Sequence, residues 1–225
     1  MHFGSDLGAT LAAQRMMLGI HDYWLFVATG VLLNLAPGQD TFYILGSSIA
    51  QGRRVGVASA LGISTGCIVH TLAAAVGLSA ILATSTSAFF AVKLAGAAYL
   101  VYLGVRYLLA PARELAGSQR AAPGHAWKAF RQGIVTNVLN PKVALFFLAF
   151  LPQFIDPNSP VKIAAFLALG LTFVVTGTAW CLLLAIGAAR VRGFFAGHPR
   201  AFTRLSQVTG FVFVLLGLRL AISER

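Results

Sequence analysis

Hydrophobic residues along the chain gather into six long runs that are separated by short polar segments. Each run is long enough to cross about 30 Å of hydrocarbon, which takes about 20 helical residues. The runs are apolar on every side and lack the strict alternation of a membrane β-strand. They cover residues 23–49, 57–82, 87–109, 129–155, 161–187 and 203–221. The pattern predicts an all-α membrane protein with six transmembrane helices.

The first and fourth runs differ from the others because a proline interrupts each of them near its middle. Pro37 follows the segment that begins Gly-x-x-x-Asn34, and Pro141 follows a similar segment that ends with Asn137. The two segments form a weak internal repeat that is offset by three helices. An odd number of crossings inverts the second half relative to the first. Inverted repeats with broken helices are typical of secondary transporters.

This repeat divides the chain into two halves. We expect a first three-helix repeat at 21–109, a cytoplasmic loop at 110–128 and a second three-helix repeat at 129–225. Residues 1–20 form an N-terminal extension without the pattern of a signal peptide. Met16 and Met17 lie just before the first apolar run. A natural start at these methionines and a tail on the surface both stay open as interpretations of the extension.

Composition agrees with a membrane location and excludes a soluble domain. Of the 225 residues, 58% are hydrophobic and 10% are charged, whereas a soluble domain has about 25% charged residues. The net charge of +11 does not indicate nucleic-acid binding, because the basic residues form no stripe with interleaved aromatics. They lie in the loops between the apolar runs instead.

The positions of these basic residues predict the orientation of the chain. Eleven of the 17 lie in or beside the first, third and fifth loops: Arg53, Arg54, Arg106, Arg113, Arg120, Lys128, Arg131, Arg190, Arg192, Arg200 and Arg204. Because cytoplasmic loops carry an excess of Lys and Arg, these loops are expected in the cytoplasm. Both chain termini are then expected outside.

Candidate chemistry lies at the two proline breaks. Proline and an adjacent glycine interrupt the helix, and free backbone groups at membrane depth are tolerated where they line a cavity or are buried in protein. Asp40 is the sole acidic residue within an apolar run, which makes it a candidate proton carrier or contact for a substrate ammonium. A plain packed kink and a carboxylate near the cytoplasmic end are the structural alternatives.

Two further polar positions extend this candidate site. Lys142 follows the second break and can pair with Asp40, meet a substrate carboxylate, or reach the membrane surface. His70 lies in the second run and suits a proton relay, although a buried histidine often just bonds to a neighbouring helix. The predicted substrate-binding residues are Asn34, Pro37, Gly38, Gln39, Asp40, Asn137, Asn140, Pro141 and Lys142, with Asp40 and His70 as predicted proton-coupling residues.

The sequence offers no set of residues for catalysis. It has no phosphate-binding loop, no nucleophile elbow and no metal-ligand spacing, so we expect neither an enzyme nor a metal or other cofactor. The small Gly62-x-x-x-Gly66 face of the second run favours close helix packing over substrate contact. A membrane channel or scaffold without coupled transport is the alternative to a secondary transporter, and a homo-oligomer stays open.

The motifs together resemble the LysE/RhtB family of amino-acid exporters. The resemblance rests on the segments 34–40, 52–54, 62–66, 93–104, 133–142 and 146–154, and it covers about residues 20–221. Gln39 stands where the family usually has a second proline. The resemblance implies export of amino acids or their derivatives across the bacterial cytoplasmic membrane, driven by the proton gradient.

Overall fold

A computed structural model of the protein describes residues 18–78, 86–109, 125–197 and 199–222. Among these residues the regular structure is helical, apart from one isolated bridge between Ile20 and Ile155. The elements are α2 (Tyr23–Leu35), α3 (Gln39–Gln51), α4 (Arg53–Ala73), η1 (Ala74–Leu78), α6 (Thr86–Leu109), α8 (Ala126–Val138), α9 (Pro141–Leu145), η2 (Phe146–Phe150), η3 (Leu151–Phe154), α10 (Lys162–Gly197) and α11 (Pro199–Ile222).

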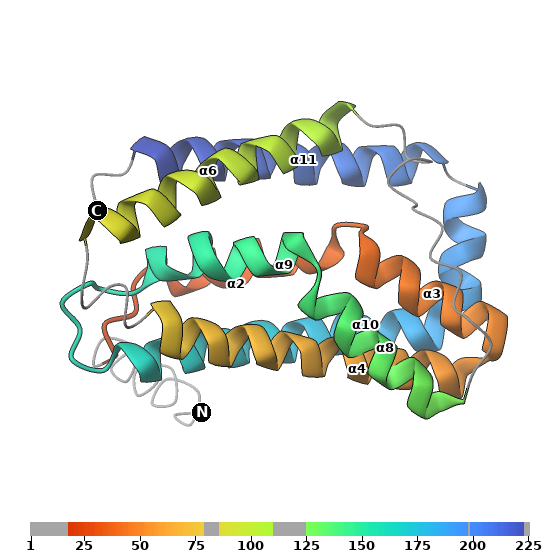
Figure 1. The fold of residues 1–225 in the computed structure, drawn as a ribbon. Coiled ribbons are helices and arrows are strands. Elements are labelled where there is room, and N and C mark those ends of the chain that lie inside the picture. Colours follow the sequence, from red (N-terminus) through yellow and green to blue (C-terminus); the bar gives the residue numbers. More distant parts are fainter. Residues whose placement is uncertain (1–17, 79–85, 110–124, 198, 223–225) are drawn as a thin grey trace, which may run out of the picture.

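The helices form an elongated bundle in which α6 and α11 pack together along one side (Figure 1). In the remainder of the bundle, α4 packs against α8, α10 and α3. Phenylalanine side chains fill much of the core between α2, α10 and the segment that follows α9, and Phe146 stacks on Phe173 with ring centroids 4.8 Å apart. These helices surround the two breaks predicted at the prolines.

The described helices follow the six predicted apolar runs, with differences at their ends. α8 begins at Ala126, inside the segment 110–128 that was expected to be a loop, and α10 continues to Gly197, ten residues beyond the predicted run. The N-terminal extension up to residue 17 and most of the predicted cytoplasmic loop lie outside the described residues. The all-helical class predicted from the sequence is confirmed for the part that is described.

Several of these helices suit a membrane by length and composition. Arg53–Leu78 and Lys162–Ala188 are each long and apolar enough to cross, and Ala126–Val138 with Pro141–Phe154 makes a third span bent by 47°. Tyr23–Leu35, Leu94–Leu109 and Gln207–Arg219 are shorter apolar helices. The described residues therefore contain two or three candidate spans together with further apolar helices.

Both prolines lie at an interruption between two helices. α2 ends at Leu35 and α3 begins at Gln39, while α8 ends at Val138 and α9 begins at Pro141. Asn140 caps α9, because its Oδ1 accepts a hydrogen bond of 3.0 Å from the backbone N–H of Lys142. The predicted breaks are therefore confirmed, and both lie near the middle of the bundle's long dimension (Figure 1).

Small residues allow α4 and α8 to approach closely beside the second break. A side chain at Gly62 would collide with the carbonyl oxygen of Phe130, and one at Gly133 would lie 2.6 Å from the carbonyl oxygen of Ser59. Small residues allow this contact between membrane helices. The packing interpretation of Gly62-x-x-x-Gly66 is confirmed.

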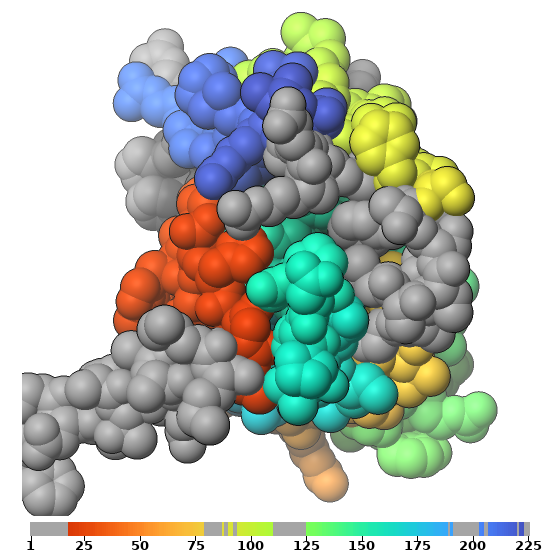
Figure 2. Space-filling view, turned by 90° about the vertical axis from the view of Figure 1, so that its left-hand side faces the viewer, coloured from red at the N-terminus to blue at the C-terminus, as the bar shows by residue number. Residues whose placement is uncertain are grey.

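At one end of the bundle, the chain before α2 lies against the segment after η3. The backbone N–H of His21 donates to the carbonyl of Phe154 at 3.0 Å, and that of Asp156 donates to Gly19 at 2.8 Å. Figure 2 looks at this end, where the start of α2 in red lies beside the teal segment of the second half. These bonds join the two halves of the chain.

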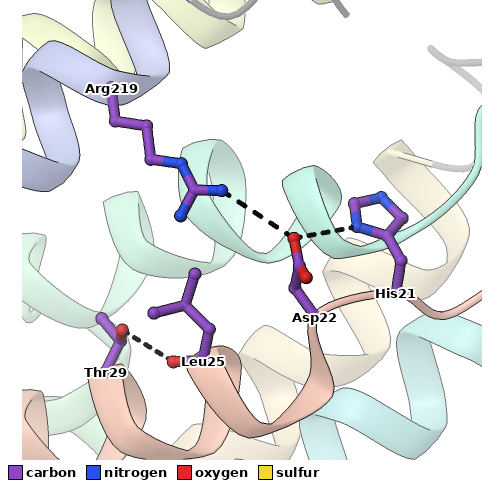
Figure 3. Close-up of polar contacts among 5 residues, drawn as sticks. All are labelled: His21, Asp22, Leu25, Thr29 and Arg219. Carbon is purple, nitrogen blue, oxygen red and sulfur yellow. Dashed lines mark hydrogen bonds and ion pairs between the residues drawn. The ribbon is translucent and has the colours of Figure 1, made fainter.

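The ion pairs of the described residues also lie at this end. The Asp22 carboxylate lies 3.7 Å from His21 Nδ1 and 3.9 Å from an Arg219 nitrogen, and Arg219 reaches it from α11 (Figure 3). All three side chains are exposed, so these pairs contribute little to stability. They lie at the opposite end of α2 from Pro37.

Candidate functional site

A central cavity lies beside the two helix breaks. The volume open to the centre of a water molecule is about 30 Å³. The total empty volume between the lining atoms, including open space at the mouth, is about 500 Å³. The central cavity is lined by Leu33, Asn34, Asp40, Thr41, Ile63, Ser64, Cys67, Asn137, Lys142, Val143, Phe173, Val174, Gly177, Thr178, Trp180 and Cys181. The cavity is therefore narrow, with room for little more than water in its enclosed part.

Lys142 connects the two broken helices. Its Nζ donates hydrogen bonds of 3.1 Å to the carbonyl oxygens of Leu33 and Ala36, at the end of α2. The last carbonyls of a helix have no partner within the helix. An ammonium from α9 therefore satisfies backbone groups that the break at Pro37 exposes.

Asp40 connects α3 to the end of α8. Its Oδ2 accepts a hydrogen bond of 2.9 Å from Asn137 Nδ2, and the backbone carbonyl of Asn137 is 3.1 Å from His70 Nε2. Since a carbonyl can only accept, His70 Nε2 carries the hydrogen in this contact. Asn140 also interacts with the Asp40 carboxylate, although its Nδ2 forms no hydrogen bond.

The sequence left open a direct pair between Asp40 and Lys142. In the described part of the chain no ion pair joins them, although their charges are close enough to interact. The Lys142 ammonium bonds to the backbone carbonyls of α2 instead. The two charged side chains therefore line the central cavity as separate groups.

α4 and α10 supply the opposite wall of the cavity. Thr178 donates a hydrogen bond of 2.8 Å to Ser64. Gly177 leaves room for Asn34, whose Oδ1 would lie 3.2 Å from a side chain added at that glycine. Trp180 adds an indole ring to the lining. The cavity thus combines an apolar wall with a few polar groups, which is typical of a small-molecule site.

The structure divides the nine predicted substrate-binding residues into two groups. Asn34, Asp40, Asn137 and Lys142 line the central cavity. The other five, Pro37, Gly38, Gln39, Asn140 and Pro141, do not line it, and they form or flank the two breaks.

The backbone of the first break is held by a residue that the sequence analysis did not single out. Tyr107 Oη donates a hydrogen bond of 2.8 Å to the carbonyl of Pro37. Residues of α4 and α10 were also missed as cavity-lining groups: Ser64, Cys67, Thr178, Trp180 and Cys181. A Thr-Gly-Thr segment followed by Trp180 inside an otherwise apolar run was the available signal.

Within the described residues, no three side chains of His, Cys, Asp or Glu gather where they could hold a metal ion. The cavity also has no glycine-rich loop for a phosphate. Its polar groups suit a small molecule that carries an ammonium group and oxygen atoms.

Comparison with known proteins shows the family of the chain. Residues 31–224 match the model of the LysE type translocator family. A homoserine/homoserine lactone efflux protein of Salmonella typhimurium is 34% identical over 205 residues, which cover 89% of this chain and 96% of the relative. Uncharacterised membrane proteins of Pseudomonas aeruginosa and Vibrio cholerae are 31% and 30% identical, over 91% and 92% of this chain and 96% and 100% of their own.

No solved structure matches the chain. The family match covers most of the sequence, and the relatives are aligned over nearly their whole length. The protein is therefore a multi-pass protein of the cell membrane and a transporter rather than an enzyme. It belongs to the LysE family of translocators.

Proposed function

We propose that the protein exports small amino acids or their derivatives, of the size and chemistry of homoserine, in exchange for protons. The Salmonella typhimurium relative, a homoserine/homoserine lactone efflux protein, supports the substrate class. The observation that carries the proposal is the position of Asp40 and Lys142 on the second segments of two broken helices, where both line one cavity. Broken helices around a central site are typical of secondary transporters.

Asp40 is the proposed group that couples proton to substrate. Among the described residues that line the cavity, it is the one carboxylate, and its Oδ1 is buried without a hydrogen-bond partner. A proton and a substrate ammonium would compete for the same carboxylate. Binding of substrate from the cytoplasm would then require release of the proton, and arrival of a proton from outside would displace the substrate.

An efflux assay in inside-out membrane vesicles tests the proposal. Homoserine and homoserine lactone are expected to accumulate in the vesicles when the interior is acidic, and a protonophore is expected to abolish this accumulation. Vesicles without the protein provide the control. If substrate accumulates to the same extent without a proton gradient, proton antiport is contradicted. If neither compound is transported, the proposed substrate class is contradicted.

We also propose that the six apolar runs form two inverted three-helix repeats. The matching breaks after Leu35 and Val138 support this arrangement. So does Lys142, whose bonds to Leu33 and Ala36 bring the two breaks together. In an inverted arrangement, the starts of the two halves lie on opposite sides of the membrane.

Cysteine labelling tests the orientation. Cysteines at Arg54 and Lys128 are expected to react with an impermeant thiol reagent only after permeabilisation, whereas a cysteine at Asn158 reacts in intact cells. All three side chains are exposed, whereas Ser159 beside Asn158 is buried. The background would lack Cys67 and Cys181. If Lys128→Cys were labelled in intact cells and Asn158→Cys were not, the protein would have the opposite orientation.

His70 is proposed to adjust the chemistry of Asp40 rather than to carry the transported proton. It bonds to the backbone of Asn137, whose side chain bonds to Asp40, and its charge would act on the carboxylate through space. His70→Gln keeps a donor for the Asn137 carbonyl and removes the imidazole. We expect transport to continue with a shifted pH profile, measured as initial rate against external pH. Complete loss of coupled transport in a stably inserted variant would make His70 an obligatory proton carrier.

A further inference from the structure

Buried polar atoms without a partner are concentrated in the central cavity. Two are acceptors, Asp40 Oδ1 and Asn137 Oδ1, and two are donors, Asn34 Nδ2 and Trp180 Nε1. None of these four atoms has a hydrogen-bond partner in the described part of the chain. Buried polar atoms in proteins are almost always bonded, so such a group in a cavity indicates atoms that bind a ligand or water.

The donors available for a substrate's oxygen atoms are uncharged. Lys142 is the one cation among the described residues that line the cavity, and two of its three N–H groups bond to the carbonyls of Leu33 and Ala36. Asn34 and Trp180 each contribute a neutral N–H. The Lys142 ammonium is therefore held mainly by backbone carbonyls, whereas the Asp40 carboxylate keeps Oδ1 for a ligand.

We infer that the cavity prefers amino compounds whose carboxyl group is capped, as in a lactone, an amide or an ester. The substrate ammonium bonds to Asp40 and Asn137, and its carbonyl oxygen accepts hydrogen bonds from Asn34 and Trp180. This inference rests on the proposed export function and narrows its substrate class. The residues that set the specificity are Asn34 and Trp180.

A free amino acid fits the same groups less well because it carries a carboxylate. A buried anion is costly unless a cation pairs with it. Two of the three Lys142 N–H groups are engaged by the carbonyls of Leu33 and Ala36, so one N–H is left to pair with that carboxylate. The carboxylate would also share the cavity with Asp40, and like charges in one cavity repel. A monocation avoids both costs.

A matched series of substrates tests the preference in the unaltered protein. Homoserine, homoserine lactone and homoserine amide share one side-chain skeleton and differ in the charge of the carboxyl group. Initial uptake into inside-out vesicles would be measured at about pH 6, below the usual pKa of an α-amino group. We expect a KM about tenfold lower or better for the lactone and the amide than for homoserine. Equal or tighter binding of homoserine overturns the inference.

Variants test the two donors. Trp180→Phe keeps the ring and removes the N–H, and Asn34→Leu keeps approximate size and removes the amide. Each is expected to raise the KM for the amide and lactone about tenfold, with a smaller change for homoserine. Trp127→Phe is the matched control, because Trp127 is 67% exposed on α8 and away from the cavity.

The outcomes separate this inference from the proposed function. Transport of none of the three compounds contradicts the function itself. Transport of homoserine at least as efficiently as of the capped compounds contradicts the inference alone. If one variant does not accumulate, the other variant and the substrate series of the unaltered protein still decide. If a Trp180→Phe or Asn34→Leu protein inserts in the membrane and keeps the same preference for the capped compounds over homoserine, that residue does not determine the specificity.

Discussion

Replacing Asp40 with Asn is expected to abolish proton-coupled efflux while the protein still folds and inserts. The change removes the charge that attracts a substrate ammonium and the group that exchanges a proton. Loss of one member of a buried charge pair costs about 2–5 kcal/mol, and about 1.4 kcal/mol is a factor of ten, so we expect transport to fall at least about 30-fold. The rate of substrate accumulation in inside-out vesicles, with and without a pH gradient, measures this loss.

The fold is expected to survive this change because Asn keeps the local hydrogen bond. Asn137 Nδ2 donates to Asp40 Oδ2 at 2.9 Å, and the amide oxygen of an Asn at the same position can accept that bond. Asp156→Asn is the matched control, since Asp156 is exposed in the segment between η3 and α10. Equal membrane levels of both variants are required. Normal coupled efflux by the Asp40→Asn protein would show that Asp40 has a structural role.

The helix breaks could be predicted because their cause is local. Pro37 and Pro141 remove a backbone donor and obstruct the preceding turn, whatever the rest of the fold does. The apolar runs were likewise long enough to fix the helices, within a few residues at their ends. The extension of α10 to Gly197 was missed because the predicted helix was ended at the last residue of the apolar run. A helix can continue beyond the membrane into water, where its residues are polar.

The cavity was only half predictable because the sequence carries only a weak signal for its second wall. Asn34 and Asp40 are unusual in apolar runs, so they were identified from the sequence. Thr178 and Trp180 lie in a short polar segment of a long apolar helix, and neither periodicity nor charge shows which side of that helix faces the cavity. The partners of Lys142 could not be predicted either. They are backbone carbonyls left free at a helix break, and the sequence suggests only side chains of opposite charge as partners for a lysine.

Replacing Lys142 with Met is expected to destabilise the protein by about 2–5 kcal/mol, because two buried carbonyls lose their partner. Met is similar in length and has no donor, so packing is largely kept. The bonds to Leu33 and Ala36 disappear, and the end of α2 loses its connection to α9. Thermal unfolding in detergent measures the effect. Lys128→Met, at an exposed position on α8, is the control and is expected to unfold like the unaltered protein.

A double variant separates two reasons for the destabilisation. If Lys142 mainly compensates the charge of Asp40, then adding Asp40→Asn to Lys142→Met should restore most of the stability, because no unpaired charge remains. If Lys142 mainly satisfies the carbonyls at the end of α2, the double variant should stay nearly as unstable as Lys142→Met. The described hydrogen bonds favour the second result, since Nζ bonds to Leu33 and Ala36 and forms no ion pair with Asp40. The coupling energy from this double-mutant cycle is therefore expected to be small relative to the loss in Lys142→Met. A large coupling energy would make Lys142 the counter-ion of Asp40, and it would then be available to a substrate carboxylate whenever Asp40 is neutral.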